Sequence, residues 1–235
     1  MSSLDEPLQA ALARVNERIS AAARAAGRDP GKIALLAVSK AFPAEAVIAA
    51  AHAGQRRFGE SYVQEAVGKI AQVRAMAPDL ALEWHFIGPI QSNKTRAIAE
   101  RFDWVHSVER LKIAQRLSEQ RPPDLPPLAV LIQVNVSGAA SKRGVAPAEA
   151  SDLAHAVARL PRLRLRGLMA IPEPEQDPAR QRVAFARLRE LLQRLQREGL
   201  AVDTLSMGMS ADLEAAIAEG ATIVRVGTAI FGERA

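Results

Sequence analysis

The chain has 235 residues and no cysteine, and its 31 lysine and arginine residues against 26 acidic ones give a net charge of +5. The lack of cysteine excludes disulfides, a thiolate nucleophile and cysteine-ligated zinc or iron–sulfur clusters, and no two of the four histidines lie four residues apart, so a helical zinc pair is absent too. With 49% hydrophobic and 24% charged residues, the composition is that of a globular domain and not of a disordered chain.

The start of the chain and its apolar stretches indicate a protein of the cytoplasm. Asp5 and Glu6 stand where a signal peptide would carry basic residues and then an apolar run. The longest apolar stretch lies around residues 128–136, far short of the ~20 residues that a membrane helix needs. We therefore expect a cytoplasmic location and no membrane partner.

The first predicted element is a helix, because apolar residues recur at three- and four-residue steps. These residues are Leu4, Leu8, Leu12, Val15 and Ile19. Gly27 stands where a C-terminal cap belongs. The next segment, residues 33–38, is a short apolar run with β-branched residues, bounded by Gly31 and Pro43, and is predicted to be a buried strand.

Strand-like and helix-like runs then alternate to the end of the chain. Strands are predicted at 33–39, 56–60, 83–88, 103–108, 128–136, 163–171, 203–207 and 222–227. Helices are predicted between them at 44–53, 61–76, 92–101, 109–119, 147–159, 178–198 and 211–219. Eight strands alternating with helices favour parallel pairing, and eight is the number that closes a (β/α)8 barrel. An open doubly wound sheet is the competing topology.

The last outer helix of such a barrel is missing from the predicted elements. Residues 228–235, after the eighth strand, are too few to form it, and the N-terminal helix could cover that part of the barrel. No linker, repeat or low-complexity segment divides the chain. The prediction is a single α/β domain over residues 1–235, a (β/α)8 TIM barrel with an additional N-terminal helix and no full eighth outer helix.

Lys40 is the first candidate functional residue, because function collects at the C-terminal ends of barrel strands. Of the chain's six lysines, it alone stands at the end of a predicted apolar strand. Burial at the barrel mouth would lower the pKa of its amine and leave it neutral, ready to form a Schiff base with a carbonyl. The alternatives are a lysine paired with a carboxylate and one that extends into solvent.

Two turns of small residues follow the seventh and eighth predicted strands. Gly208 permits close backbone approach, and Ser210 is a natural N-cap for the predicted helix 211–219. Gly227 and Thr228 form the second turn. Turns at these two strands make the usual phosphate cradle of barrels. A lysine combined with such a cradle suits a ligand that has an aldehyde at one end and a phosphate at the other, which is pyridoxal 5′-phosphate (PLP).

Arg225, in the eighth predicted strand, would then face the pyridine nitrogen of this ligand. A guanidinium keeps its own protons and leaves that nitrogen unprotonated. Such a ring is a weaker electron sink, which favours modest chemistry or none. The alternative for Arg225 is an ion pair that closes the barrel interior. His85, inside a predicted strand, is expected to be a hydrogen-bonded core histidine, and Tyr62 to pack or make a structural hydrogen bond.

Eight segments carry a resemblance to a known family. They are 36–40 (LAVSK), 58–60 (FGE), 84–88 (WHFIG), 91–94 (QSNK), 133–138 (QVNVSG), 165–172 (LRGLMAIP), 205–210 (LSMGMS) and 224–232 (VRVGTAIFG). From about residue 33 to residue 234 the chain resembles the pyridoxal phosphate homeostasis proteins, the YggS/PROSC family. The resemblance implies a barrel like the N-terminal domain of alanine racemase. It also implies a protein that binds and hands over PLP, keeps vitamin B6 and amino-acid pools balanced, and has no established catalytic turnover.

The resemblance further implies the roles of single residues. They are a Schiff base at Lys40, phosphate contacts from Ser210, Gly227 and Thr228, Arg225 near the ring nitrogen, and Ser206 and Met207 lining the site. Two positions depart from the family pattern. Ser61 stands beside the cofactor where an asparagine is usual, and Phe42 replaces a second lysine that many members carry. A transfer route through that lysine is therefore not carried over, whereas Lys142 matches another family lysine.

Three functions follow as hypotheses. The first is a PLP-binding homeostasis protein, not an enzyme, that releases the cofactor from Lys40 to a free amine or to the lysine of an apo-enzyme. The alternative is a small PLP-dependent amino-acid racemase, although the second domain that brings a tyrosine in alanine racemase-like enzymes is missing. The third is a nucleic-acid or regulatory binding protein, suggested by the basic excess. An aromatic share of 4% offers few stacking platforms, so we expect no nucleic acid. A monomer is the default expectation.

Overall fold

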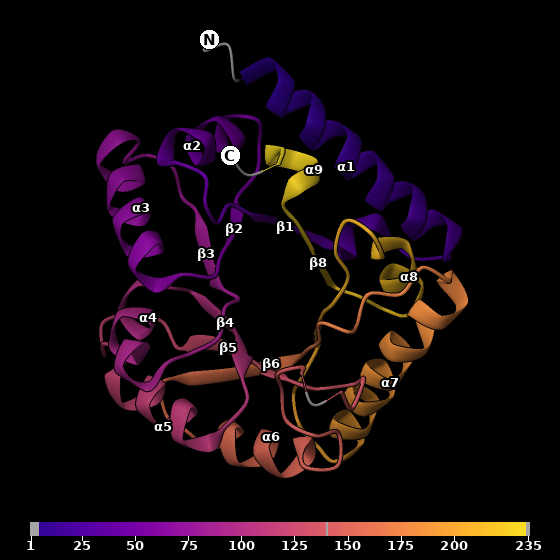
Figure 1. Cartoon of the computed structure of the whole chain (residues 1–235). Helices are drawn as coiled ribbons and strands as arrows, with labels where there is room; N and C mark the ends of the chain where they lie inside the picture. Colours follow the sequence, from indigo (N-terminus) through magenta and orange to yellow (C-terminus); the bar gives the residue numbers. More distant parts are fainter. Residues whose placement is uncertain (1–4, 140, 234–235) are drawn as a thin grey trace.

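Eight parallel strands close into a barrel in chain order, because β1 pairs with β2 on one side and with β8 on the other (Figure 1). The structure, a computed structural model, describes residues 5–139 and 141–233. The strands are β1 Ala34–Val38, β2 Arg57–Glu60, β3 Glu83–Phe86, β4 Trp104–Val108, β5 Leu128–Gln133, β6 Leu163–Met169, β7 Thr204–Ser206 and β8 Ile223–Val226. The predicted (β/α)8 barrel is thus confirmed. The open doubly wound sheet is wrong, because the β1–β8 pairing leaves the sheet without an edge.

The strands are short, from three residues in β7 to seven in β6. All six residues of β5 are buried, as expected for a strand covered by helices outside and by side chains inside. The prediction extended this strand to residue 136, three residues too far. After Gln133 the chain leaves the ladder, and Val134 pairs instead with Val145 in an isolated parallel bridge.

Helices surround the strands on all sides in Figure 1. They are α1 Asp5–Ala25, α2 Ala44–His52, α3 Val63–Met76, α4 Thr95–Arg101, α5 Leu111–Gln120, α6 Ala150–Ala158, α7 Pro178–Arg197, α8 Leu213–Ala218 and α9 Thr228–Phe231, with single 3₁₀ turns at Pro30–Lys32 and Ser92–Lys94. The stripe predicted for α7 is buried, at Phe185, Leu188, Leu192 and Leu195. Within the described residues, no helix is long and apolar enough to cross a bilayer.

The N-terminal helix covers the side of the barrel where the last outer helix is reduced to one turn. In Figure 1, α1 runs along the outside of the barrel, next to α8 and α9, and both of these helices contact it. The apolar side chains predicted to face inward are buried, at Leu8, Leu12, Val15 and Ile19. Leu4, predicted as part of the same stripe, lies outside the described residues. Both the extra helix and the absence of a full eighth outer helix are therefore confirmed.

Candidate functional site

A cavity of about 580 Å³ opens at the carboxyl ends of the strands. Of the residues predicted for the site, Lys40, Ser61, Ser210, Arg225, Gly227 and Thr228 line it. Ser206 and Met207, which were also predicted to line the site, are fully buried and are not among the residues that line the cavity, and Ser206 contacts Arg225. Tyr62 does not pack as predicted, because it lies at the cavity rim with 55% of its surface exposed.

The backbone on both sides of Lys40 is held by side chains of α3. Ala41, directly after the lysine, has a φ of 67°, a left-handed conformation that is uncommon for a residue with a Cβ atom. The Ala41 N–H donates to Glu65 Oε1 at 2.6 Å, and Lys69 Nζ donates to the Ser39 carbonyl at 2.7 Å. These two contacts fix the turn that brings Lys40 to the cavity.

A buried ion cluster beside this turn was missed by the sequence reasoning. Lys69 Nζ lies 2.7 Å from Glu60 Oε1 and 2.9 Å from Glu65 Oε1. The Ser39 hydroxyl donates to Glu60 Oε1 at 2.7 Å. Burial raises the pKa of Glu60, and the Lys69 ammonium opposes that rise. The signal that the sequence offered for this cluster was Lys69, which stands within the apolar stripe of α3.

Arg225 reaches the cavity from β8, although its side chain is almost completely buried. Its Nη1 donates to Ser206 Oγ at 2.7 Å, and its Nη2 donates to the Ala170 carbonyl at 2.9 Å. Burial lowers the pKa of Arg225 to about 10, so the guanidinium stays charged at neutral pH. Its direct partners are a hydroxyl and a carbonyl, not the carboxylate of the alternative prediction.

A chain of polar side chains continues from Arg225 through the barrel interior. Ser206 Oγ lies 2.9 Å from Nδ1 of His106, whose Nε2 lies 2.8 Å from Nδ1 of His85. Nε2 of His85 lies 2.8 Å from Oε1 of Glu83, the first residue of β3. Both imidazoles are fully buried. The prediction of His85 as a hydrogen-bonded core histidine is confirmed.

The two buried histidines should make the fold sensitive to acid. Burial lowers the pKa of both rings, and His85 and Arg225 lower that of His106 further. Below about pH 6.5 the unfolded chain takes up protons here whereas the native chain does not, so the stability present above this pH is lost as pH falls. We expect the free energy of unfolding in urea to decrease as pH falls, by at most about 1.4 kcal/mol per pH unit for each histidine.

Glu83 extends this acid sensitivity to lower pH. The hydrogen bond from His85 is the main cause that lowers the pKa of Glu83 to about 2. Its contribution is present above the ordinary value of 4.5 and is lost as pH falls toward 2. His52→Gln is the control variant, because it removes an exposed histidine that lies outside this line of hydrogen bonds. A free energy of unfolding that stays constant between about pH 7 and about pH 5 would contradict this expectation.

Part of the predicted cradle is present at β8. Gly227 precedes α9, so the N–H groups of Thr228 and Ala229 at the start of this helix have no acceptor within it. A Cβ atom at Gly227 would lie 3.1 Å from the Val38 carbonyl oxygen. This close approach of the ends of β1 and β8 explains why a glycine stands at position 227.

The turn after β7 differs from the prediction. Ser210 is not the N-cap of the following helix, because α8 begins at Leu213 and its N-cap is Asp212. The physical reason is a competing turn, in which Asp212 Oδ1 accepts a hydrogen bond from the Met209 N–H at 2.6 Å. Ser210 lies within this turn and lines the cavity.

Gly208, between β7 and this turn, should not tolerate a side chain. Its φ is +90°, and a Cβ atom would lie 2.5 Å from the Cβ of Ala216. We expect Gly208→Ala to lower the free energy of unfolding by about 2 kcal/mol, through backbone strain and overpacking. Gly68→Ala is the matched control, because position 68 in α3 is open and should gain up to about 1 kcal/mol. Urea unfolding that gives the same change for both variants would contradict the expectation.

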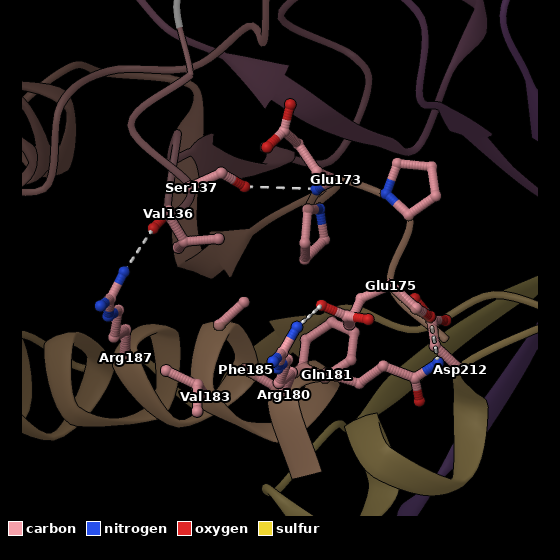
Figure 2. Close-up of a pocket in the computed structure, with 13 residues that line it drawn as sticks. Val136, Ser137, Glu173, Glu175, Arg180, Gln181, Val183, Phe185, Arg187 and Asp212 are labelled. Carbon is pink, nitrogen blue, oxygen red and sulfur yellow. Dashed lines mark hydrogen bonds and ion pairs between the residues drawn. The ribbon is translucent and has the colours of Figure 1, made fainter. Parts of the chain in front are cut away.

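Other candidate ligand sites are less complete. A second hollow of about 240 Å³ lies between α7 and the loops after β5 and β6 (Figure 2). There the Glu173 N–H donates to Ser137 Oγ at 3.2 Å, and Arg180 pairs with Glu175 at 3.9 Å. No lysine of the described chain lines this hollow. The described residues also contain no group of three or more histidine, aspartate or glutamate side chains that could hold a metal ion.

Similarity to known proteins extends over nearly the whole chain. Residues 11–235 match the family model "Alanine racemase, N-terminal domain". The chain is 66% identical over 223 residues to the pyridoxal phosphate homeostasis protein of Pseudomonas aeruginosa, covering 95% of this chain and 94% of that protein. It is 56% identical over 223 residues to the Escherichia coli K12 protein of the same name, covering 95% of each. PipY of Synechococcus elongatus, solved with PLP bound, is 36% identical with a TM-score of 0.82 over 96% of this chain and 100% of PipY.

Proposed function

This chain belongs to the family of pyridoxal phosphate homeostasis proteins, and on that premise we propose that it binds PLP reversibly at Lys40 and passes it on without turning over a substrate. One observation carries the proposal. A single cavity brings together Lys40 from the end of β1, Arg225 from β8 and the turn at Gly227 and Thr228. The PLP present in the solved PipY relative supports the choice of ligand.

The cavity suits PLP in its charge and in its reactive groups. When bound, PLP supplies an aldehyde that condenses reversibly with a primary amine and releases water. Lys40 offers that amine from a half-buried position, on a backbone held by Glu65 and Lys69. The N–H groups at the start of α9 and the hydroxyls of Ser210 and Thr228 offer hydrogen-bond donors to the phosphate.

Arg225 favours storage of the cofactor over its use in catalysis. Its charged guanidinium would donate a hydrogen bond to the pyridine nitrogen and leave that nitrogen unprotonated. The ring is then a weaker electron sink, which suits holding and release. Ser206 accepts a hydrogen bond from the guanidinium, and the buried Met207 follows Ser206 in the sequence. Ser61 lines the cavity.

The proposal also covers domain, location and partners. The family match over residues 11–235 and the closed barrel support a single PLP-binding domain over residues 1–235. We expect this domain to act in the cytoplasm as a monomer, with PLP-dependent apo-enzymes as recipients of the cofactor. No nucleic acid and no membrane takes part in the proposed role.

Racemisation of amino acids is the alternative function, favoured by the match to the alanine racemase domain. Two-base racemisation needs an acid or base on each face of the ring. Lys40 would serve one face, and Tyr62, which lines the same cavity, is a candidate for the other. Racemase assays on the wild-type protein and on Lys40→Ala distinguish the two functions, since robust turnover that depends on Lys40 would favour the enzyme.

Borohydride trapping tests the proposed function directly. The purified protein is loaded with PLP, its visible absorption is recorded, and the reduced protein is digested and mapped. We expect one PLP per chain, attached to Nζ of Lys40. Pyridoxal, which lacks the phosphate, is the matched control ligand and should bind more weakly. A protein that cannot be loaded, or a label on another lysine, would contradict the proposal.

A further inference from the structure

The polar chain behind Arg225 has a defined direction. Guanidinium groups only donate, so Ser206 Oγ accepts from Arg225, and its hydroxyl proton remains available for donation to Nδ1 of His106. A neutral imidazole that accepts at Nδ1 carries its proton on Nε2, and this N–H donates to Nδ1 of His85. His85 in turn donates through Nε2 to the Glu83 carboxylate.

The Glu83 end of this line of hydrogen bonds fixes the direction. Glu83 also accepts a hydrogen bond from Arg57 Nε at 3.1 Å, which supports its ionised form. A carboxylate without a proton can only accept, so His85 donates to it through Nε2 and, as a neutral ring, accepts at Nδ1. The Glu83 end therefore selects one tautomer of each neutral ring, and the Arg225 end is compatible with it, so that every link has one donor and one acceptor.

Packing keeps the two rings in these orientations. Glu83 and His85 are alternate residues of β3, and Trp104 and His106 are alternate residues of β4, so each pair lies on one face of its strand. The His85 ring stacks on Trp104, with ring centroids 5.4 Å apart and an angle of 9° between the planes. The line of hydrogen bonds thus joins the amino end of β3 to the cavity at the carboxyl ends.

We propose that His106 and His85 are positioning residues for PLP. Through Ser206 they hold the Arg225 guanidinium in the orientation that meets the pyridine ring, and Glu83 fixes the other end of this line of hydrogen bonds. This inference rests on the proposed function, because Arg225 has a pyridine ring to meet only when PLP is bound in the cavity. Ser206 can accept from Arg225 while His106 takes the hydroxyl proton. A protonated His106 would turn this acceptor into a donor and add a second cation near the guanidinium, so the arrangement requires neutral rings.

The tautomers can be tested without the cofactor. Nitrogen-15 NMR of the ligand-free protein should show both buried imidazoles neutral at pH 7, each with its proton on Nε2. The exposed His52, which lies outside this line of hydrogen bonds, gives a separate imidazole signal for comparison. A proton on Nδ1 of His85 or His106 would overturn the proposed direction and the inference with it.

PLP binding tests the positioning role. We expect His106→Leu and the milder Ser206→Ala to raise the Kd for PLP about tenfold, or about 1.4 kcal/mol, and to shift the visible band of the loaded protein. Glu83→Gln, at the opposite end of the barrel, should also raise the Kd for PLP and shift the visible band, but by smaller amounts. Val105→Ala is the control, because it removes buried volume from β4 next to His106 but leaves every hydrogen bond between Arg225 and Glu83 in place.

The outcomes separate this inference from the proposed function. Folded His106→Leu and Ser206→Ala proteins with the wild-type Kd and visible band would overturn the positioning role alone. An equal change of Kd and band in Val105→Ala would also overturn it, because the effect would then come from core packing. A wild-type protein that does not bind PLP would overturn the proposed function and the positioning role together.

Discussion

Replacing Lys40 with arginine should abolish covalent PLP binding and leave the fold intact. The guanidinium keeps the positive charge and the length of the side chain, but it does not condense with an aldehyde at neutral pH, because it stays protonated. We expect the visible absorption that accompanies loading to vanish and the Kd for PLP to rise at least about a hundredfold, or about 3 kcal/mol. Absorption titration and borohydride trapping measure both effects.

Lys112→Arg is the matched control for this change, because Lys112 is exposed on α5 and is not one of the residues that line the cavity. It should load PLP like the wild-type protein. Thermal unfolding midpoints of both variants should stay within about 3 °C of the wild-type value. Persistent visible absorption and a trapped label in Lys40→Arg would show that another amine holds the cofactor.

Replacing Lys69 with methionine should destabilise the barrel strongly. The side chains of Lys69 and Glu60 are 4% and 0% exposed, and Glu60 Oε2 already has no hydrogen-bond partner among the described residues. Without the ammonium, the carboxylate is buried with the Ser39 hydroxyl as its remaining partner, at a cost of about 3–5 kcal/mol. The turn at Lys40 also loses its contact to the Ser39 carbonyl, so PLP affinity should fall as well.

Urea unfolding with two further variants tests the cause. Lys32→Met makes the same change at an exposed position and should cost less than about 0.5 kcal/mol. The double variant Lys69→Met/Glu60→Gln should recover part of the loss, because an amide carries no charge to bury. A loss below about 1 kcal/mol in Lys69→Met would contradict the ion-cluster explanation.

Features that depend on local periodicity could be predicted from the sequence. The apolar stripe of α7 and the apolar run of β5 each indicate which side chains of one element are buried. The alternation of such elements limits the topology to parallel sheets with right-handed crossovers. Lys40, Arg225, Gly227 and Thr228 could be proposed because strand ends in a barrel converge on one face.

Contacts between distant segments could not be predicted. Lys69 is 30 residues from Ser39, and His106 is 100 residues from Ser206, so no periodicity in the sequence records these hydrogen bonds. The Ser210 N-cap was wrong for a related reason. Two competing caps lie within three residues, and the chain adopts the one in which the Asp212 carboxylate reaches back to Met209.

The seam between β1 and β8 also determines when the cavity comes into existence during synthesis. Lys40 follows the first strand, whereas Arg225 belongs to the eighth and Gly227 follows it, so all eight strands are synthesised before these groups can meet. A nascent chain that stops before β8 carries the amine but neither the guanidinium nor the α9 turn. Uptake of the proposed cofactor into this cavity should therefore wait until the eighth strand has closed the barrel.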